Sequence, residues 1–144
     1  MRSEEDIAKG FQEGFDCAMA TLMEVAGDIG MTEDQAKRTA SCFGIGMLQG
    51  SLCGAVTAGF IAIGCKYGNT VPNDRAQKGL VMAKKEEFLS MFTEEFGELT
   101  CQGLLDGLDL RKPEDMAKGR ERGVFSTFCP KLCKRSAEMI KTVI

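Results

Sequence analysis

The chain has 144 residues, of which 44% are hydrophobic and 27% are charged, and its net charge is −3. This composition suits one folded domain with a sizeable core and argues against intrinsic disorder. Histidine is absent, which excludes His-ligated zinc, Ser–His–Asp triads, Cys–His nucleophile pairs and haem attachment through C-x-x-C-H.

Charge is distributed unevenly between the two ends of the chain. Residues 1–34 hold nine acids and two bases, whereas residues 111–144 hold nine bases and four acids. No nucleic-acid-binding motif accompanies the basic end, so we expect no nucleic-acid partner. The opposed charges favour contact between the two ends, either within one chain or across a homodimer.

A stripe of apolar residues begins near the N-terminus. Its members are spaced by three or four positions over residues 7–25, which predicts one helix with one buried face. They are Ile7, Phe11, Phe15, Ala18, Leu22 and Val25. A neighbouring stripe carries Gly10, Gly14 and Cys17. Because glycine is unfavourable inside a helix, two glycines on this stripe predict the close approach of another helix beside Cys17.

A second helix is predicted after a turn at residues 28–30. Thr32-Glu33-Asp34-Gln35 has the capping-box pattern, in which the Thr and Gln side chains each accept a hydrogen bond from the other residue's backbone N–H. We expect this helix to run toward Gly44 and to be broken at Gly44-Ile45-Gly46.

The stretch SLCGAVTAGFIAIGC, residues 51–65, belongs to 27 consecutive uncharged residues. That length would allow a membrane-spanning helix. Its glycines and polar residues favour a turn partway and two shorter helices, so we favour a buried helix in a soluble bundle over membrane insertion. Gly54, Gly59 and Gly64 do not share one face, which suits a helix surrounded on several sides.

The C-terminal half continues the helical pattern. Pro72-Asn73-Asp74 predicts a turn, followed by a long helix from about Arg75 to Phe96 that Gly97 ends. A short helix is expected around residues 101–105. Residues 106–123, with three glycines and one proline, are predicted to be largely loop.

The last helix is predicted to begin at Cys129, with Cys129 as its N-cap and Pro130 at its first helical position. No strand alternation, internal repeat or linker is evident. The sequence therefore predicts an all-α fold over residues 1–144. We expect a compact single-domain helical bundle of about five to six helices with a buried central Gly-rich helix.

Seven cysteines carry most of the chemical information. The first ten residues, MRSEEDIAKG, contain no apolar signal-peptide core, so we expect a cytoplasmic protein. Thiols in a reducing compartment are more often metal ligands, catalytic groups or core residues than permanent disulfides. No C-x-x-C spacing occurs, which argues against a standard zinc knuckle.

Two of the cysteines are candidates for reactive thiols. Cys53 lies in the first turn of its predicted helix, and Cys129 lies near Lys131, Lys134 and Arg135. Helix N-termini and nearby cations both stabilise a thiolate, so we expect a lowered pKa for Cys53 and Cys129. The alternative is that each cysteine is simply a small buried hydrophobe.

A motif and its surroundings resemble a known family. Residues 53–59, CGAVTAG, fit the pattern C-G-A-x-x-G and lead into an apolar helix that ends at Lys66-Tyr67-Gly68. Asp16-Cys17-Ala18 stands upstream, and Thr100-Cys101 and Cys129 stand downstream. Over nearly its whole length the chain resembles the C_GCAxxG_C_C family of redox-active proteins.

The resemblance implies a small helical domain with a redox role. It also implies four characteristic cysteines, which fall here on Cys17, Cys53, Cys101 and Cys129. The remaining three lie outside the family pattern, and the sequence assigns them no role. They are Cys42, Cys65 and Cys133.

The leading hypothesis is a cytosolic thiol-redox protein whose four family cysteines cluster and carry out thiol–disulfide exchange or electron transfer with an unidentified partner. We expect Cys53 or Cys129 to be the attacking thiolate. Four cysteines allow three pairings, and the pairing we expect is Cys17 with Cys53 and Cys101 with Cys129.

Two alternatives remain open. In the first, Cys17, Cys53, Cys101 and Cys129 converge on zinc, iron or an iron–sulfur cluster in a binding module without catalysis. In the second, the cysteines only pack the core of a structural protein. Whether the chain is an enzyme, namely a thiol–disulfide oxidoreductase, is therefore undecided by its sequence.

Overall fold

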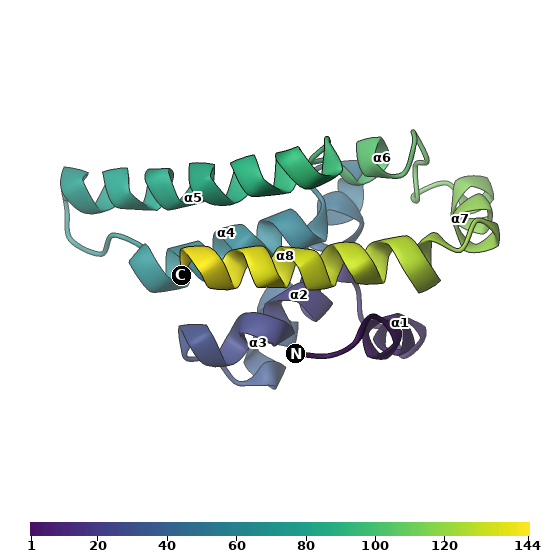
Figure 1. Ribbon diagram of the computed structural model, residues 1–144, viewed down its shortest axis with the longest axis horizontal. Coiled ribbons are helices and arrows are strands. Elements are labelled where there is room, and N and C mark those ends of the chain that lie inside the picture. The colour runs from purple at the N-terminus through teal and green to yellow at the C-terminus, as the bar shows by residue number, and fades with distance from the viewer.

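Helices account for all the regular structure of the chain (Figure 1). The computed structural model describes residues 1–144. The α-helices are α1 Glu4–Gln12, α2 Cys17–Val25, α3 Glu33–Ala40, α4 Gly54–Tyr67, α5 Arg75–Phe96, α6 Cys101–Leu104, α7 Pro113–Glu121 and α8 Cys129–Val143. Shorter turns are the 3-10 helix η1 Ala26–Ile29 and the π-helical turns η2 Gly46–Gly50 and η3 Val124–Phe128. The all-α prediction is confirmed, but the helices outnumber the five to six expected.

Local capping residues explain where several helices begin. The predicted capping box at Thr32 is present, and Gln35 accepts from the Thr32 backbone N–H at 2.8 Å. A second capping box, between Ser3 and Asp6, opens α1. The Asp74 side chain caps α5, which runs from Arg75 to Phe96 as predicted and ends at the left-handed Gly97.

The single N-terminal helix predicted over residues 7–25 is wrong, because the chain breaks between α1 and α2. Gly14 adopts a φ of +96°, and the Asp16 carboxylate accepts from the Met19 backbone N–H at 3.0 Å, which starts a new helix. The apolar stripe survives the break: Ile7, in α1, and Leu22, in α2, are both buried in one core cluster.

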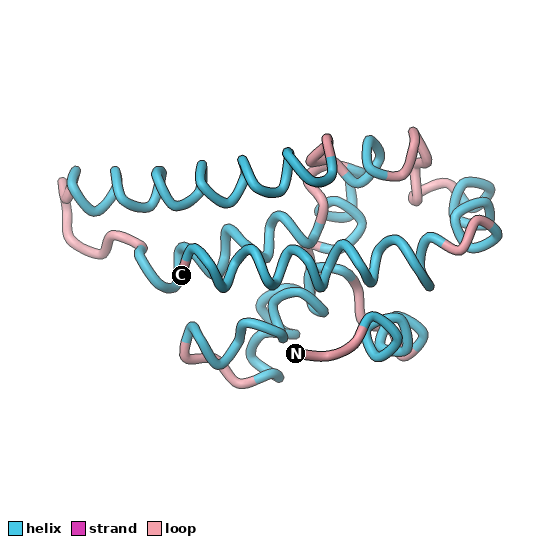
Figure 2. The backbone as a smooth tube through the Cα atoms, in the orientation of Figure 1, coloured by secondary structure: helices cyan, strands magenta, loops and turns pink.

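Helix α4 is the buried central helix that its composition predicted. It packs against α2, α5 and α8, and in Figures 1 and 2 it lies between α5 and α8. Its glycines make room for neighbours: a Cβ on Gly59 would overlap the Phe88 ring of α5. None of the helices combines the length and apolar composition that a transmembrane span requires.

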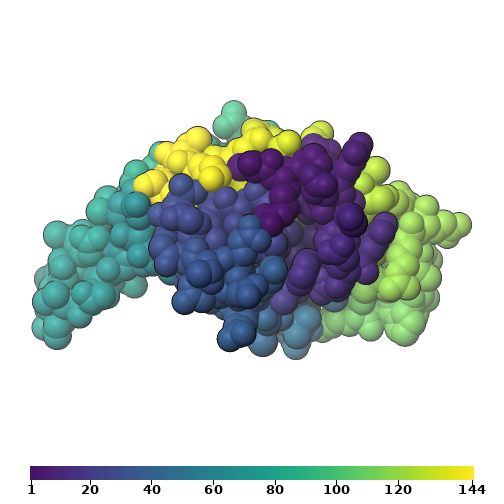
Figure 3. Space-filling model, turned by 90° about the horizontal axis from the view of Figure 1, so that it is seen from below, coloured from purple at the N-terminus to yellow at the C-terminus, as the bar shows by residue number.

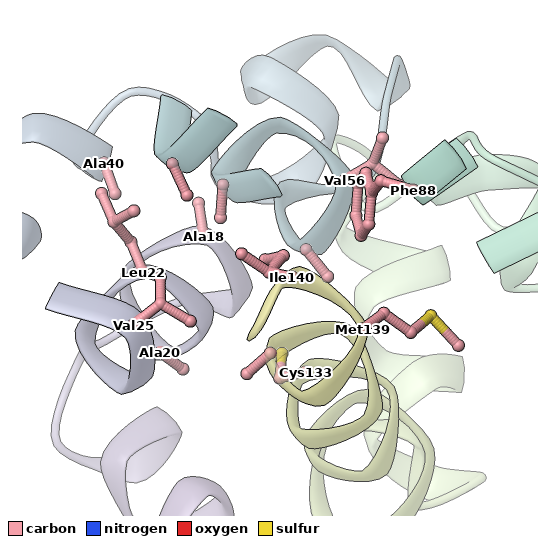
Figure 4. Packing of buried hydrophobic residues seen from close by; sticks show 14 of the residues in the cluster. Ala18, Ala20, Leu22, Val25, Ala40, Val56, Phe88, Cys133, Met139 and Ile140 are labelled. Atoms are coloured by element: carbon pink, nitrogen blue, oxygen red, sulfur yellow. The ribbon is translucent and has the colours of Figure 1, made fainter. Parts of the chain in front are cut away.

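A row of aromatic rings fixes α5 against the rest of the bundle. Phe60 of α4 meets Phe88 edge to face at a centroid distance of 6.5 Å, and the row continues through Phe92 and Phe96 to Phe128. Phe88 and Phe92 are fully buried. Close packing around Val56, Phe88, Cys133 and Ile140 is seen in Figure 4. The rings therefore connect the centre of the core with the start of α8.

Two predictions for the C-terminal third need correction. Residues 106–123 are not largely loop, because Pro113 opens α7 with Glu114 and Asp115 in its first turn. Cys129 is not an N-cap either. The turn η3 runs directly into α8, so that Cys129 is the first helical residue and the right-handed Phe128 precedes it. The chain around Cys129 is thus already helical before α8 begins.

Candidate functional site

A cavity of about 590 Å³ lies at one end of the bundle. The four cysteines that the family resemblance singled out all line it: Cys17, Cys53, Cys101 and Cys129. Aromatic and aliphatic side chains form most of its wall, among them Phe11, Phe15, Leu104, Leu105, Phe125 and Phe128. In Figure 3 the dark purple α1 segment lies beside the yellow-green α7–η3 segment, the two regions that supply much of this wall.

Each of these four cysteines stands at the beginning of a different helix. Cys17, Cys101 and Cys129 are the first residues of α2, α6 and α8, and Cys53 is the N-cap of α4. Four segments remote in sequence therefore direct their starting residues toward one cavity. The prediction that sulfur atoms from distant parts of the chain share a pocket agrees with this arrangement, while their catalytic role stays a prediction.

A short antiparallel bridge holds two of the thiols in register. Leu52 pairs with Thr100. On either side of that pair, the Cys53 N–H donates to the Leu99 carbonyl at 2.8 Å and the Cys101 N–H donates to the Ser51 carbonyl at 2.7 Å. Because Cys53 and Cys101 each follow a bridge residue directly, the bridge fixes the starts of α4 and α6 relative to each other.

Cys17 and Cys53 lie close together where α2 crosses the start of α4, because a Cβ on Gly54, the residue after Cys53, would lie 2.5 Å from the Cys17 sulfur. The neighbouring Cys53 thiol lowers the pKa of Cys17 and outweighs the opposing effects of burial and of the Asp16 carboxylate. Backbone N–H groups of Ile45 and Gly54 also bond to the Cys17 sulfur and lower its pKa further. Removing the first proton from this pair therefore leaves the thiolate on Cys17.

The Ile45 N–H reaches Cys17 from an unusual piece of backbone. Ile45, Gly46, Met47 and Leu48 all have φ values between 52° and 61°, which makes one turn of left-handed helix. Residues other than glycine avoid this region, because the left-handed conformation costs about 1–2 kcal/mol for each of them. The helix predicted to run toward Gly44 instead ends at Ala40, and the strained turn beside Cys17 is a feature that the sequence did not reveal.

The expected low pKa values of Cys53 and Cys129 are wrong. The pKa of Cys53 is raised, first by the neighbouring Cys17 and then by burial. Burial raises the pKa of Cys129, and it raises that of Cys101 to about 12. The nearby cation Arg135 instead pairs with Glu95 at 2.9 Å and with Glu138.

Cys133 belongs to this group of thiols although it lies outside the family pattern. It is fully buried, and its thiol donates to the Cys17 carbonyl at 3.6 Å. Burial and the neighbouring Cys17 raise its pKa. The spacing of four residues from Cys129 places both on one face of α8 and could have indicated it. Cys42 and Cys65 are exposed and do not line the cavity.

The cavity-lining cysteines were also predicted, in one alternative, to form a metal site. The family cysteines line one cavity, but no group of three or more Cys, Asp or Glu side chains has the mutual spacing that would hold one metal ion. All seven cysteines are free thiols. The observed arrangement therefore does not provide a ready Cys₄ site for zinc, iron or an iron–sulfur cluster.

These features define a class of protein: a small all-α domain with thiols from several helix starts around one apolar cavity. Over residues 15–143 the chain matches the family described as "Putative redox-active protein (C_GCAxxG_C_C)". The chain belongs to this family. The match contains all four family cysteines and leaves out α1, whose Phe11 and Gln12 line the cavity. Neither curated proteins nor solved structures gave a significant match to the chain.

Proposed function

We propose that this protein is a thiol–disulfide redox protein in which Cys17 attacks and Cys53 resolves. The observation that carries the proposal is the Cys17–Cys53 pair. Both residues line the cavity, the start of α4 after Cys53 packs directly on the Cys17 sulfur, and the neighbouring Cys53 thiol lowers the pKa of Cys17. Membership of a redox-active family supports the same chemistry. Free thiols throughout the chain suit a reducing compartment, which we propose to be the cytosol.

The proposed reaction moves two electrons from the thiol pair to a disulfide substrate. The Cys17 thiolate attacks one sulfur of the substrate, the substrate S–S bond breaks, and the leaving sulfur takes up a proton. Cys53 then loses its proton and attacks the Cys17 sulfur, which forms a Cys17–Cys53 disulfide and releases the second substrate thiol. Two protein thiols are oxidised and one substrate disulfide is reduced to two thiols.

The role we propose for Cys53 agrees with its surroundings. A resolving thiol reacts only after Cys17 has become part of a mixed disulfide and has lost its negative charge. At that stage the neighbouring Cys17 thiolate no longer raises the pKa of Cys53. Cys53 therefore becomes easier to ionise when its attack is required.

We also propose that Cys101 and Cys129 act as a second pair. Both line the same cavity, and each is the first residue of its helix. Burial keeps both protonated near neutral pH. We therefore expect this pair to react more slowly than Cys17, with oxidation to a Cys101–Cys129 disulfide by a second substrate molecule.

The test is to map which thiols a mild disulfide oxidises first. The reduced protein is mixed with one equivalent of 2-hydroxyethyl disulfide, quenched with N-ethylmaleimide and digested, and linked peptides are identified by mass spectrometry. We expect a Cys17–Cys53 linkage in the wild type, and a mixed disulfide held on Cys17 in Cys53→Ser. Cys65→Ser is the matched control, because Cys65 is exposed on α4 and outside the cavity.

Two results would contradict the proposal. One is oxidation that begins at the exposed Cys42 or Cys65 while Cys17 stays reduced. The other is a Cys17→Ser variant that forms the first intramolecular disulfide at the wild-type rate. Either would show that exposure, and not the Cys17–Cys53 pair, governs the reactivity of these thiols.

A further inference from the structure

The cavity wall carries one cationic side chain, and that side chain has no partner in the protein. Two acidic or basic residues line the cavity, Asp16 and Arg120. Asp16 caps α2 and accepts from the backbone N–H of Met19 at 3.0 Å. Arg120, an exposed residue in the last turn of α7, forms no ion pair and donates no side-chain hydrogen bond. The cation is therefore free to bind an anion at the opening.

The remaining wall is largely apolar and the thiols lie deep. Of the 21 lining residues 15 are hydrophobic, so a molecule that fills the cavity gains most from an apolar body. Cys53 is 7% exposed and Cys101 is 8% exposed, whereas the attacking Cys17 is half-buried. The burial of the resolving thiol Cys53 favours a small molecule, of a size suited to about 590 Å³, over a disulfide on the surface of a folded protein.

We propose that the substrate is a small apolar disulfide that carries a single carboxylate. This inference rests on the thiol–disulfide function proposed above and adds the substrate class. The apolar part occupies the space between α1 and η3, the disulfide faces Cys17, and the carboxylate binds Arg120 at the opening. Charge-assisted hydrogen bonds from a guanidinium to a carboxylate give both affinity and a fixed orientation.

The chemical step is the same exchange, now within one substrate molecule. When the disulfide is part of a ring, the Cys17 thiolate opens the ring, and the released substrate sulfur is protonated while it remains attached. Cys53 loses its proton and attacks the Cys17 sulfur, and the substrate leaves as a dithiol. Two electrons and two protons pass from the protein thiols to the substrate, and the reverse step uses the dithiol as reductant.

Lipoate and lipoamide make a suitable pair of probes. They share the same cyclic disulfide and acyl chain, but only lipoate carries a carboxylate. We expect kcat/KM, or the single-turnover rate constant, to be about fivefold higher for lipoate, and we expect this preference to shrink at high ionic strength. Arg120→Gln should reduce the lipoate-to-lipoamide ratio to about one, and Arg120→Lys should restore part of it.

Arg122→Gln is the matched control. Arg122 is an exposed arginine two positions along the chain and does not line the cavity, so this change removes the same charge and should leave the ratio at its wild-type value. A wild-type ratio of one, or an equal fall in Arg120→Gln and Arg122→Gln, would overturn the proposed substrate class.

Octanoate separates failure of this inference from failure of the redox function. It has the apolar chain and the carboxylate but no disulfide. By titration calorimetry we expect it to bind the wild type more tightly than Arg120→Gln, and to slow the reaction with lipoate competitively. Reduction of both disulfides without octanoate binding would overturn the carboxylate subsite alone. Octanoate binding without reduction of either disulfide would overturn the redox function and, with it, the substrate class.

Discussion

Gly54 offers the sharpest test of how the thiol pair is held together. It is the first residue of α4, directly after Cys53, and α2 crosses it closely. A Cβ built on Gly54 would lie 2.5 Å from the Cys17 sulfur and 2.7 Å from the Ala18 backbone nitrogen. Both separations are far inside normal contact distance. Gly54→Ala therefore forces α4 away from α2 at the point where Cys17 and Cys53 meet.

The size of the effect follows from what can move. The atoms that the new methyl group meets include the backbone of α2, which is itself packed against α4 and α8. Overpacking of this kind costs about 1–3 kcal/mol. Alanine regains part of its helix propensity, up to about 1 kcal/mol. We therefore expect Gly54→Ala to lower the free energy of unfolding by about 1.5 kcal/mol and Tm by about 3–6 °C.

Gly64 on the same helix is the matched control. It is exposed in the helix interior, and a Cβ there would meet nothing within 4 Å. Gly64→Ala should therefore stabilise the protein by about 0.5–1 kcal/mol through helix propensity alone. Thermal and urea unfolding of the reduced proteins, monitored by circular dichroism, give both values.

A second measurement links the same substitution to function. The pKa of Cys17 is read from the pH dependence of its alkylation by iodoacetamide, followed by mass spectrometry. Gly54→Ala should raise this pKa toward the ordinary thiol value of 9.0, because it separates Cys17 from the Cys53 thiol and the Gly54 N–H. If Gly54→Ala is as stable as Gly64→Ala and its Cys17 pKa is unchanged, the close crossing of α2 and α4 is incorrect.

Three further predictions concern other parts of the chain. Burial raises the pKa of Cys101 to about 12, so between pH 9 and 12 the thiol ionises in the unfolded chain but not in the folded one, and stability falls by about 1.4 kcal/mol per pH unit on its account. Cys101→Ser should make the pH dependence of urea unfolding under reducing conditions shallower by that amount. Met47→Gly should raise the free energy of unfolding by about 0.5–1 kcal/mol because Met47 is 44% exposed and left-handed. By contrast, Met82→Gly in the right-handed α5 should lower it by about 1 kcal/mol. Elemental analysis of anaerobically purified protein should find zinc and iron well below one equivalent, since no three candidate ligands are suitably spaced; a stoichiometric metal lost in Cys17→Ser would favour the Cys₄ alternative.

Features encoded by a few neighbouring residues were predictable. The bounds of α5 follow from the turn at Pro72-Asn73-Asp74 and from the left-handed Gly97, and the start of α3 follows from its capping box. The break between α1 and α2 was not predictable from periodicity, because the apolar stripe keeps its phase across Gly14. Helix α7 was missed because glycine content suggested a loop, although Gly119 packs against Phe125 and the other two glycines lie outside the helix.

The candidate site likewise combines features that the sequence predicted with features that it did not. The identity of the four cavity-lining cysteines followed from the resemblance to the C_GCAxxG_C_C family. The direction of their pKa shifts did not, because burial and hydrogen-bond partners arise only when distant segments meet. Helix position and local cations favoured Cys53 and Cys129, whereas the fold surrounds Cys17 with donors from residues 45, 53 and 54. A prediction of the Cys17 pKa from neighbouring residues could not include the backbone N–H of Ile45, because the left-handed turn that places it is not evident in the sequence.

Reactivity at neutral pH is therefore a property of the folded state in this protein. The chain has no histidine, and the lowered pKa of Cys17 depends on one thiol and two backbone N–H donors. Two of these donors, Cys53 and Gly54, depend on the crossing of α2 and α4, and the third depends on the left-handed turn. Opening the crossing of α2 and α4, or the left-handed turn, should return the pKa of Cys17 toward that of an ordinary thiol. Greater exposure should thus make this sulfur a slower nucleophile near pH 7, the reverse of what accessibility alone would give.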